Sequence, residues 1–236
     1  MFRHGISAVP TSRIAEQYYC EQKVELGYLQ GRVETESMQE GQELHEQLIP
    51  MQKATLKRIV RGIKREPVFV ASFPIVAEFS QLVLVGVPDA VVFVKGNPGF
   101  VIELKTTRGD TSRLWDDQIV QARVYGLILE QMGFDCSGLK LAIPRVRRTR
   151  QARSWKSTFL NSVIQDLLKE PSTRPRKRKE STIHIIDYNR AHAVADVKWT
   201  EAYWLSRRQP IPSGSPAKCG ICEYGEVCSH ASMKKS

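Results

Sequence analysis

One strand-forming stretch constrains the fold of this chain more than any other feature. Residues 67–94 are rich in Val, Phe and Ile and predict two or three strands. The five residues 95–99 have the composition of a turn, and residues 100–106 predict a further strand. We therefore expect a hairpin with arms at residues 86–94 and 100–106, joined by a five-residue turn.

Helical patterns flank this region on both sides. Residues 12–30, with Cys20 inside, and residues 34–61 precede it, whereas residues 114–132, 151–170 and 191–208 follow it. Short strands are predicted at residues 139–143 and 182–187. This alternation predicts an α/β fold in a single domain over residues 1–236, with a central mixed sheet flanked by helices.

The positive charge of the chain is concentrated in one region. The whole chain has 236 residues and a formal net charge of +10, and residues 145–179 hold twelve Lys and Arg against two acidic residues. A basic block attracts polyanions such as nucleic acids, although a solvated basic loop has the same composition. No apolar run approaches the roughly 18–20 residues of a membrane helix. We expect a soluble, cytoplasmic protein without a membrane partner.

Two carboxylates and a lysine form the central chemical pattern. Because side chains alternate along a strand, Glu103 and Lys105 project from one face while Ile102 and Leu104 enter the core. Asp89 lies on the other arm of the predicted hairpin, within reach of Glu103. Two close carboxylates repel unless a cation lies between them, and Mg²⁺ or Mn²⁺ prefers such oxygens. The alternative is an exposed pair on an edge strand.

Polar side chains on two predicted helices extend this pattern. Gln118, Gln121 and Tyr125 share one helix face, which suits contacts with phosphates and bases but is also typical of an ordinary polar face. His45 precedes an apolar stretch, where an imidazole could complete a metal shell or serve only a structural role.

Three cysteines near the C-terminus indicate a metal site. Cys219, Cys222 and Cys228 form C-x2-C-x5-C, which leaves a four-ligand site one thiolate short. Cys20 and Cys136 are the remaining thiols. Cys136 follows a predicted helix and precedes a strand, a position that suits a packed thiol. The spacing alone is compatible with Zn²⁺ or with an iron–sulfur cluster.

Taken in order, these motifs resemble the RecB-type PD-(D/E)xK nucleases. The resemblance rests on the motifs Gly41-x3-His45, Gly86-Val-Pro-Asp89, Glu103-Leu-Lys105 and Gln121-x3-Tyr125. With cysteines at both ends, the arrangement is similar to the CRISPR-associated exonuclease Cas-four family and its relatives, including AddB-type nuclease domains and exonuclease V.

The resemblance implies a role for each matching residue. His45, Asp89 and Glu103 would bind Mg²⁺ or Mn²⁺, Lys105 would be the catalytic lysine, and Gln121 and Tyr125 would organise the active site. Cys20, Cys219, Cys222 and Cys228 would hold a [4Fe–4S] cluster in a lobe built from about residues 12–30 and 210–230, which joins both chain ends to a restriction-endonuclease-like core. The basic linker at about residues 171–180 lies outside the family pattern. The predicted DNA contacts are Gln118, Arg174, Arg176, Lys177, Arg178 and Lys179.

The implied activity is metal-dependent hydrolysis of single-stranded DNA from its ends. The family adds a role in CRISPR spacer acquisition, with Cas integrase proteins as partners. A DNA-repair exonuclease of the same fold would present the same residues. A catalytically silent DNA-binding scaffold is the alternative from another class, but it would be expected to lack Asp89, Glu103 or Lys105, and all three are present.

Overall fold

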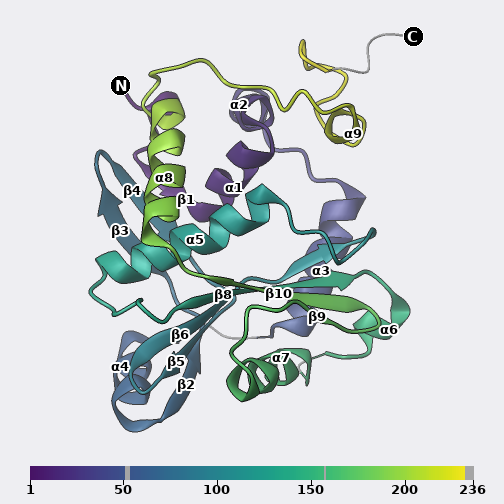
Figure 1. Cartoon of the computed structure of the whole chain (residues 1–236). Helices are drawn as coiled ribbons and strands as arrows, with labels where there is room; N and C mark the ends of the chain where they lie inside the picture. The colour runs from purple at the N-terminus through teal and green to yellow at the C-terminus, as the bar shows by residue number, and fades with distance from the viewer. Residues whose placement is uncertain (51–53, 157, 232–236) are drawn as a thin grey trace.

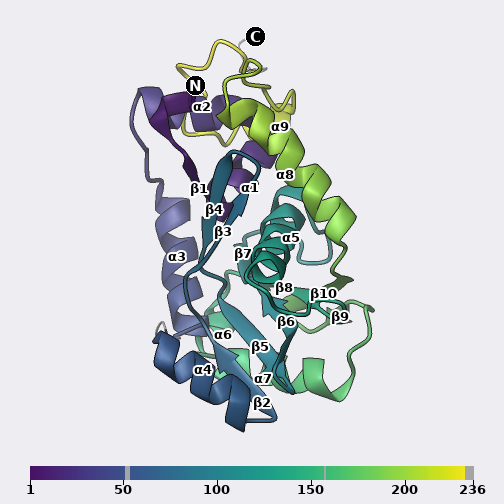
Figure 2. The same cartoon turned by 90° about the vertical axis from the view of Figure 1, so that its left-hand side faces the viewer.

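A computed structural model describes residues 1–50, 54–156 and 158–231. The chain forms three layers, with a mixed sheet between two groups of helices (Figures 1 and 2). α5 (Asp116–Gln131) and α8 (Arg190–Trp204) cover one face, and α3 (Glu36–Leu48) and α7 (Thr158–Lys169) cover the other. The predicted α/β fold with a central mixed sheet flanked by helices is confirmed.

The main sheet combines strands from both halves of the chain. The order is β2-β5-β6-β8-β10-β9, and β7 also pairs with β8. β8 runs parallel to β6 and β7, whereas the other neighbours are antiparallel. A parallel connection needs a crossover, and α5 provides it, which places this helix over the junction between β6 and β7. The strands are β2 (Val68–Ala71), β5 (Ala90–Val94), β6 (Asn97–Ile102), β7 (Lys105–Thr107), β8 (Lys140–Arg147), β9 (Arg176–Lys177) and β10 (Ser181–Asp187).

The predicted hairpin exists, but its turn is shorter than expected. β5 and β6 are joined through Lys95 and Gly96, both at positive φ, as a two-residue turn of this kind requires. A bulge opposite Val92 and Phe93 absorbs the extra residue. The second arm therefore begins at Asn97 and ends at Ile102, and β7 pairs with β8 instead of continuing the hairpin.

A second, smaller sheet packs beside the main one. It has the order β1-β4-β3 and consists of β1 (Ala8–Pro10), β4 (Leu82–Gly86) and β3 (Ile75–Phe79). Residues 67–94 thus form four strands rather than two or three. Because β1 pairs with β4 and leads directly into α1 (Thr11–Tyr19), the N-terminal residues are brought next to the strand that precedes Asp89.

Three predicted helices are interrupted. Residues 12–30 form α1 and α2 (Glu21–Leu29), since Cys20 between them has an extended backbone, so the prediction of Cys20 inside a helix is wrong. α3 ends at Leu48, just before Pro50, and α4 (Leu56–Arg65) is a separate helix. The predicted helix at residues 151–170 is divided into α6 (Arg150–Arg153) and α7.

The remaining elements connect the chain ends and close the sheet. A short 3-10 helix (Arg3–Gly5) opens the chain, and α9 (Pro216–Cys219) lies near its other end, on the same side of the molecule as α2 (Figure 1). Residues 171–180, expected as a linker, contribute the edge strand β9, which pairs with β10. No helix within the described ranges is long and apolar enough to cross a membrane.

Candidate active site

The register of the hairpin places Asp89 and Glu103 side by side. Ala90 pairs with Ile102, so the next residue outward on each strand is a carboxylate. Asp89 Oδ2 accepts a hydrogen bond from the backbone N–H of Leu104 at 2.7 Å, which fixes this carboxylate against the second arm. Glu103 is 5% exposed, and its own N–H donates to Ala142 on β8. The sheet backbone therefore holds the Asp89 carboxylate and the main chain of Glu103.

Lys105 links this pair to α5. Its ammonium donates to Glu103 Oε1 at 2.9 Å and to Gln121 Oε1 at 2.7 Å. The Gln121 amide in turn donates to the Tyr125 hydroxyl at 2.9 Å, and that hydroxyl donates to the carbonyl of Val87 at 3.4 Å. The predicted alternation is confirmed, because Ile102 and Leu104 are buried on the opposite side from Lys105.

His45 reaches the site from the other face of the molecule. Its Nε2 lies 2.9 Å from Asp89 Oδ2. One helical turn earlier, Gly41 lies so close to β7 that an added Cβ would be 3.1 Å from Thr106 Oγ1 and 2.8 Å from an Arg148 nitrogen. The glycine in the Gly-x3-His pattern thus permits the close approach of α3 that brings His45 to Asp89.

The two carboxylates open into a pocket of about 540 Å³. A Cβ at Gly86 would lie 2.5 Å from the Tyr125 ring, so this glycine makes room for the phenol beside β4. Sequence reasoning did not identify the outer wall, because those residues reach the pocket only through the pairing of β1, β3 and β4. The wall comprises Pro10, Thr11, Ser12, Pro74, Ile75 and Val76.

Burial shifts the protonation equilibria of the site. Desolvation, reinforced by the charge of Asp89, raises the pKa of Glu103 to about 7. Burial alone would lower the pKa of Lys105, but the adjacent Glu103 carboxylate outweighs it, and the pKa of Lys105 is raised. Burial also raises the pKa of Tyr125. Near neutral pH, Lys105 is therefore an ammonium and Tyr125 a neutral phenol.

The comparison with protein families decides the assignment. Residues 11–229 match the family model of the PD-(D/E)XK nuclease superfamily. This chain belongs to the PD-(D/E)XK nuclease superfamily. The crystal structure of SSO0001 is similar in fold, with 14% sequence identity and a TM-score of 0.49, over 95% of this chain and 87% of that chain. No curated protein matches the sequence.

Membership of this nuclease superfamily implies hydrolysis of phosphodiester bonds, typically with Mg²⁺ or Mn²⁺. The donor set fits such an ion, since carboxylates and an imidazole are suitable ligands, and the mutual repulsion of Asp89 and Glu103 favours a cation. Within the described residues, however, no group of three or more potential ligands forms a preformed metal cage. His45 and Lys105 instead form hydrogen bonds to the two carboxylates.

The structure separates the five cysteines of this nuclease into two classes. Cys20, Cys219, Cys222 and Cys228 all line one cavity between the start of α2 and the C-terminal segment. Cys136 is 5% exposed, and burial raises the pKa of its thiol to about 12, as expected for a packed core residue. The four cysteines share this cavity, but within the described chain no three potential ligands are grouped as a metal site.

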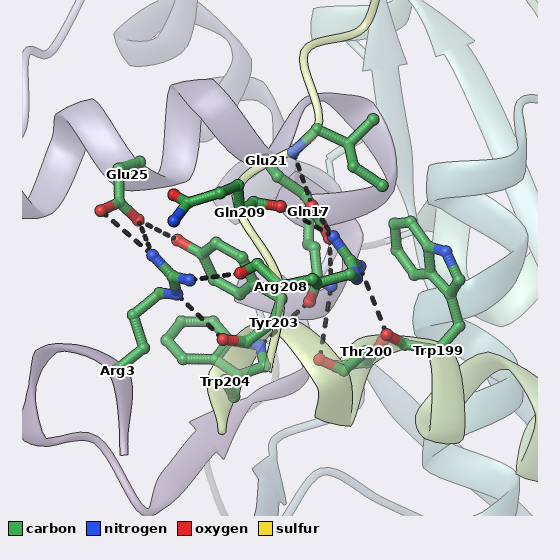
Figure 3. Close-up of polar contacts among 11 residues, drawn as sticks. Arg3, Gln17, Glu21, Glu25, Trp199, Thr200, Tyr203, Trp204, Arg208 and Gln209 are labelled. Carbon is green, nitrogen blue, oxygen red and sulfur yellow. Dashed lines mark hydrogen bonds and ion pairs between the residues drawn. The ribbon is translucent and has the colours of Figure 1, made fainter. Parts of the chain in front are cut away.

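Polar contacts hold the C-terminal segment against the N-terminal helices. The buried Glu21 carboxylate accepts hydrogen bonds from Gln17 and Arg208, as Figure 3 shows. It also accepts one from the backbone N–H of Ile211 at 2.8 Å. Arg208 also lies over the ring of Trp199 at 4.6 Å. Because Glu21 follows Cys20 directly, these contacts hold the backbone beside Cys20 against Arg208 and Ile211.

Further contacts connect the same parts of the chain. Arg3 donates to the carbonyls of Tyr203 and Arg208 and forms an ion pair with Glu25 at 3.2 Å (Figure 3). Closer to the cysteines, the Lys218 ammonium donates to the carbonyl of Tyr19 at 3.0 Å. The ends of the chain thus form one packed lobe.

The predicted DNA contacts fall in two places. Gln118 lies in the first turn of α5, half-buried and one turn before Gln121. The basic residues occupy the segment around β9 at the far edge of the main sheet. Arg178 forms an ion pair with Asp166 of α7, whereas Arg174, Lys177 and Lys179 are exposed.

Proposed function

We propose that this protein is a metal-dependent exonuclease that degrades single-stranded DNA from its ends. The observation that carries the proposal is two hydrogen-bonded rows of side chains beside an open pocket. One joins His45 to Asp89, and the other runs from Glu103 through Lys105 and Gln121 to Tyr125. Both carboxylates line the pocket, and the Lys105 ammonium is bonded to one of them, an arrangement that suits the hydrolysis of a charged phosphodiester.

The side chains have distinct tasks in this proposal. His45, Asp89 and Glu103 hold the metal ion, which when bound supplies a Lewis acid and lowers the pKa of a water molecule. Lys105 stabilises the negative charge that develops on the phosphate, because its raised pKa keeps it protonated. Gln121 fixes the direction of the ammonium.

Tyr125 orients this glutamine. Since its hydroxyl accepts from the Gln121 amide nitrogen, the amide oxygen is left to face Lys105. A phenol with a raised pKa keeps its proton and donates it to the carbonyl of Val87. The row from Glu103 to Tyr125 is thus anchored to the backbone just before Asp89.

The lobe at the chain ends has a separate role. We assign Cys20, Cys219, Cys222 and Cys228 to one [4Fe–4S] cluster, with Zn²⁺ as the alternative occupant; their common cavity supports the grouping. The basic residues at β9 add affinity for the DNA backbone. The proposed cellular role is the trimming of DNA ends in CRISPR spacer acquisition, with Cas integrase proteins as partners.

The central test is degradation of end-labelled single-stranded DNA. Linear strands should be shortened progressively with Mn²⁺ and stay intact with EDTA, while circular single strands should stay intact under both conditions. Asp89→Ala and Glu103→Ala should abolish metal-dependent cleavage and remain folded. Lys105→Ala should also lose turnover but retain most of its Mn²⁺ affinity. Wild-type cleavage rates in Glu103→Ala would refute the site assignment, and cleavage of circles would refute the exonuclease.

A further inference from the structure

Arg145 lies on the sheet directly beside the lysine of the site. It is in register with Lys105 on β7 and with Thr182 on β10. Adjacent strands are about 5 Å apart, and residues in register project from the same face. Leu141 and Ile143, which alternate with Arg145 along β8, belong to the core cluster under α5. The Arg145 side chain therefore extends toward α5, on the side where Lys105 meets Gln121.

The guanidinium of Arg145 is buried without a partner. The residue is 3% exposed, and its Nε and Nη1 are buried with no hydrogen-bond acceptor within the described residues. An arginine side chain stays charged in proteins, so an unpaired buried guanidinium is costly to the fold. Asp110 and Asp117 act on this charge only from beyond ion-pair distance. Nη2 is the one nitrogen of the group that is absent from the buried unpaired atoms of the described residues.

A nearby arginine, Arg148, shows that a guanidinium beside this sheet can find hydrogen-bond partners within the chain. Arg148 is also largely buried, yet its Nη1 donates to the carbonyl and hydroxyl oxygens of Ser37 at 2.6 and 2.9 Å, and its Nε donates to Thr106 at 3.2 Å. Arg148 therefore has a structural explanation that Arg145 lacks. Unused donors beside a phosphodiester site need an anionic acceptor from outside the chain.

The surroundings of Arg145 are otherwise well ordered by hydrogen bonds. Thr111, in the segment between β7 and α5, shares a hydrogen bond of 2.9 Å with the Thr182 hydroxyl and accepts another at its carbonyl from His184. Arg145 thus lies next to side chains that already have hydrogen-bond partners. The amide oxygen of Gln118, in the first turn of α5, the helix that packs on β8, is a second buried polar atom without a partner in the described chain.

We propose that Arg145 binds a backbone phosphate of the substrate strand, within one nucleotide of the bond that is cleaved. This inference rests on the proposed nuclease function. A phosphodiester provides hydrogen-bond acceptors and a negative charge. The Arg145 guanidinium has neither an acceptor nor an ion-pair partner among the described residues. Since phosphate contacts carry no base information, the residue contributes affinity and register without sequence preference.

The first test compares Arg145→Met with Arg148→Met. Binding of a labelled single strand in EDTA is measured by fluorescence anisotropy over a range of salt concentrations, and stability by thermal unfolding. Arg145→Met should bind at least fivefold more weakly, with a log–log salt slope reduced by about 0.7, the change expected when one phosphate is no longer bound. Its thermal midpoint should rise, because an unpaired buried charge is removed. Arg148→Met should lose stability and keep the wild-type salt slope.

The second test locates the phosphate. Strands carrying one neutral methylphosphonate linkage, moved stepwise along the sequence, should bind wild type more weakly at one position near the cleaved bond. Arg145→Met should show no further loss at that position and normal losses elsewhere. An unchanged affinity and salt slope in Arg145→Met, or a fall in its stability at an unchanged slope, would overturn the inference, and Arg145→Gln repeats the comparison with a polar side chain.

The outcomes separate this inference from the proposed function. If wild type binds but does not degrade single strands with Mn²⁺, while Arg145→Met shows the reduced slope, the phosphate contact holds and the exonuclease function falls. If wild type degrades DNA and Arg145→Met binds like wild type, only the role of Arg145 falls.

Discussion

Removing the carboxylate of Glu21 should destabilise the protein strongly. The side chain is 1% exposed and receives hydrogen bonds from Gln17 at 2.6 Å, from the backbone N–H of Ile211 at 2.8 Å and from Arg208. These donors come from α1 and from a segment about 190 positions away in the sequence. Glu21→Ala leaves all of them without their acceptor.

The magnitude follows from the burial of this pair. Breaking a buried ion pair by removing one partner costs about 3–5 kcal/mol, a large share of the roughly 5–15 kcal/mol that stabilises a typical domain. Glu21→Gln keeps an oxygen for the Ile211 N–H but loses the charge, so a loss of about 1.5–3 kcal/mol is expected. The matched control is Glu16→Ala. Glu16 forms an ion pair with Arg13 but is more exposed than Glu21, so its removal should lower the free energy of unfolding by at most about 1 kcal/mol.

Urea unfolding of the metal-free proteins measures these free energies. A second readout is the reactivity of the thiols toward a thiol reagent. In Glu21→Ala, the cysteines of the lobe should react faster, while Cys136 in the core should keep its slow rate. A free energy of unfolding for Glu21→Ala within about 1 kcal/mol of the wild-type value would show that this contact does not hold the chain ends together.

Three further measurements address the metals and the DNA. Burial raises the pKa of Glu103 to about 7 from an ordinary 4.5, so its protonated form stabilises the metal-free fold at low pH, and this contribution is lost as the pH rises through about 7. The stability of wild type relative to Glu103→Gln should therefore fall between pH 4.5 and 7 in thermal unfolding with EDTA, and a flat difference would contradict the shift. Cys20→Ala should lose the brown colour and about four irons per chain of the anaerobically purified protein, whereas Cys136→Ala should keep both; full metal retention in Cys20→Ala would refute the four-ligand grouping. Neutralising the five cations of residues 174–179 should lower the salt slope of single-strand binding by about 0.7 for each phosphate that is no longer bound, and an unchanged slope would exclude these side chains from the DNA interface.

Sequence patterns predicted the part of the site that depends on local spacing. The alternation along residues 102–105 placed Glu103 and Lys105 on one side, and the hairpin brought Asp89 beside Glu103. The spacing of Gln121 and Tyr125 at one helical turn also produced the contact that the structure shows. These relations follow from the periods of strands and helices, which hold wherever the element is placed.

Local patterns failed where distant contacts decide the backbone. Nothing in the residues around Cys20 breaks a helical pattern, yet the chain turns there and Glu21 is bound by Arg208 and Ile211 from the other end of the sequence. The break after Leu48 is different, because Pro50 was a readable signal for it.

The sequence by itself determined the element types of the strand-rich region, the residue types of the site and the family of the chain. Only the tertiary structure decided which walls enclose the pocket, that the four cysteines of the lobe share a cavity, and that Arg145 lies buried without a partner in the described chain beside Lys105. The physical reason is that periodicity fixes the face on which a side chain lies, whereas the identity of its neighbours depends on strand order and crossovers that bring distant segments together.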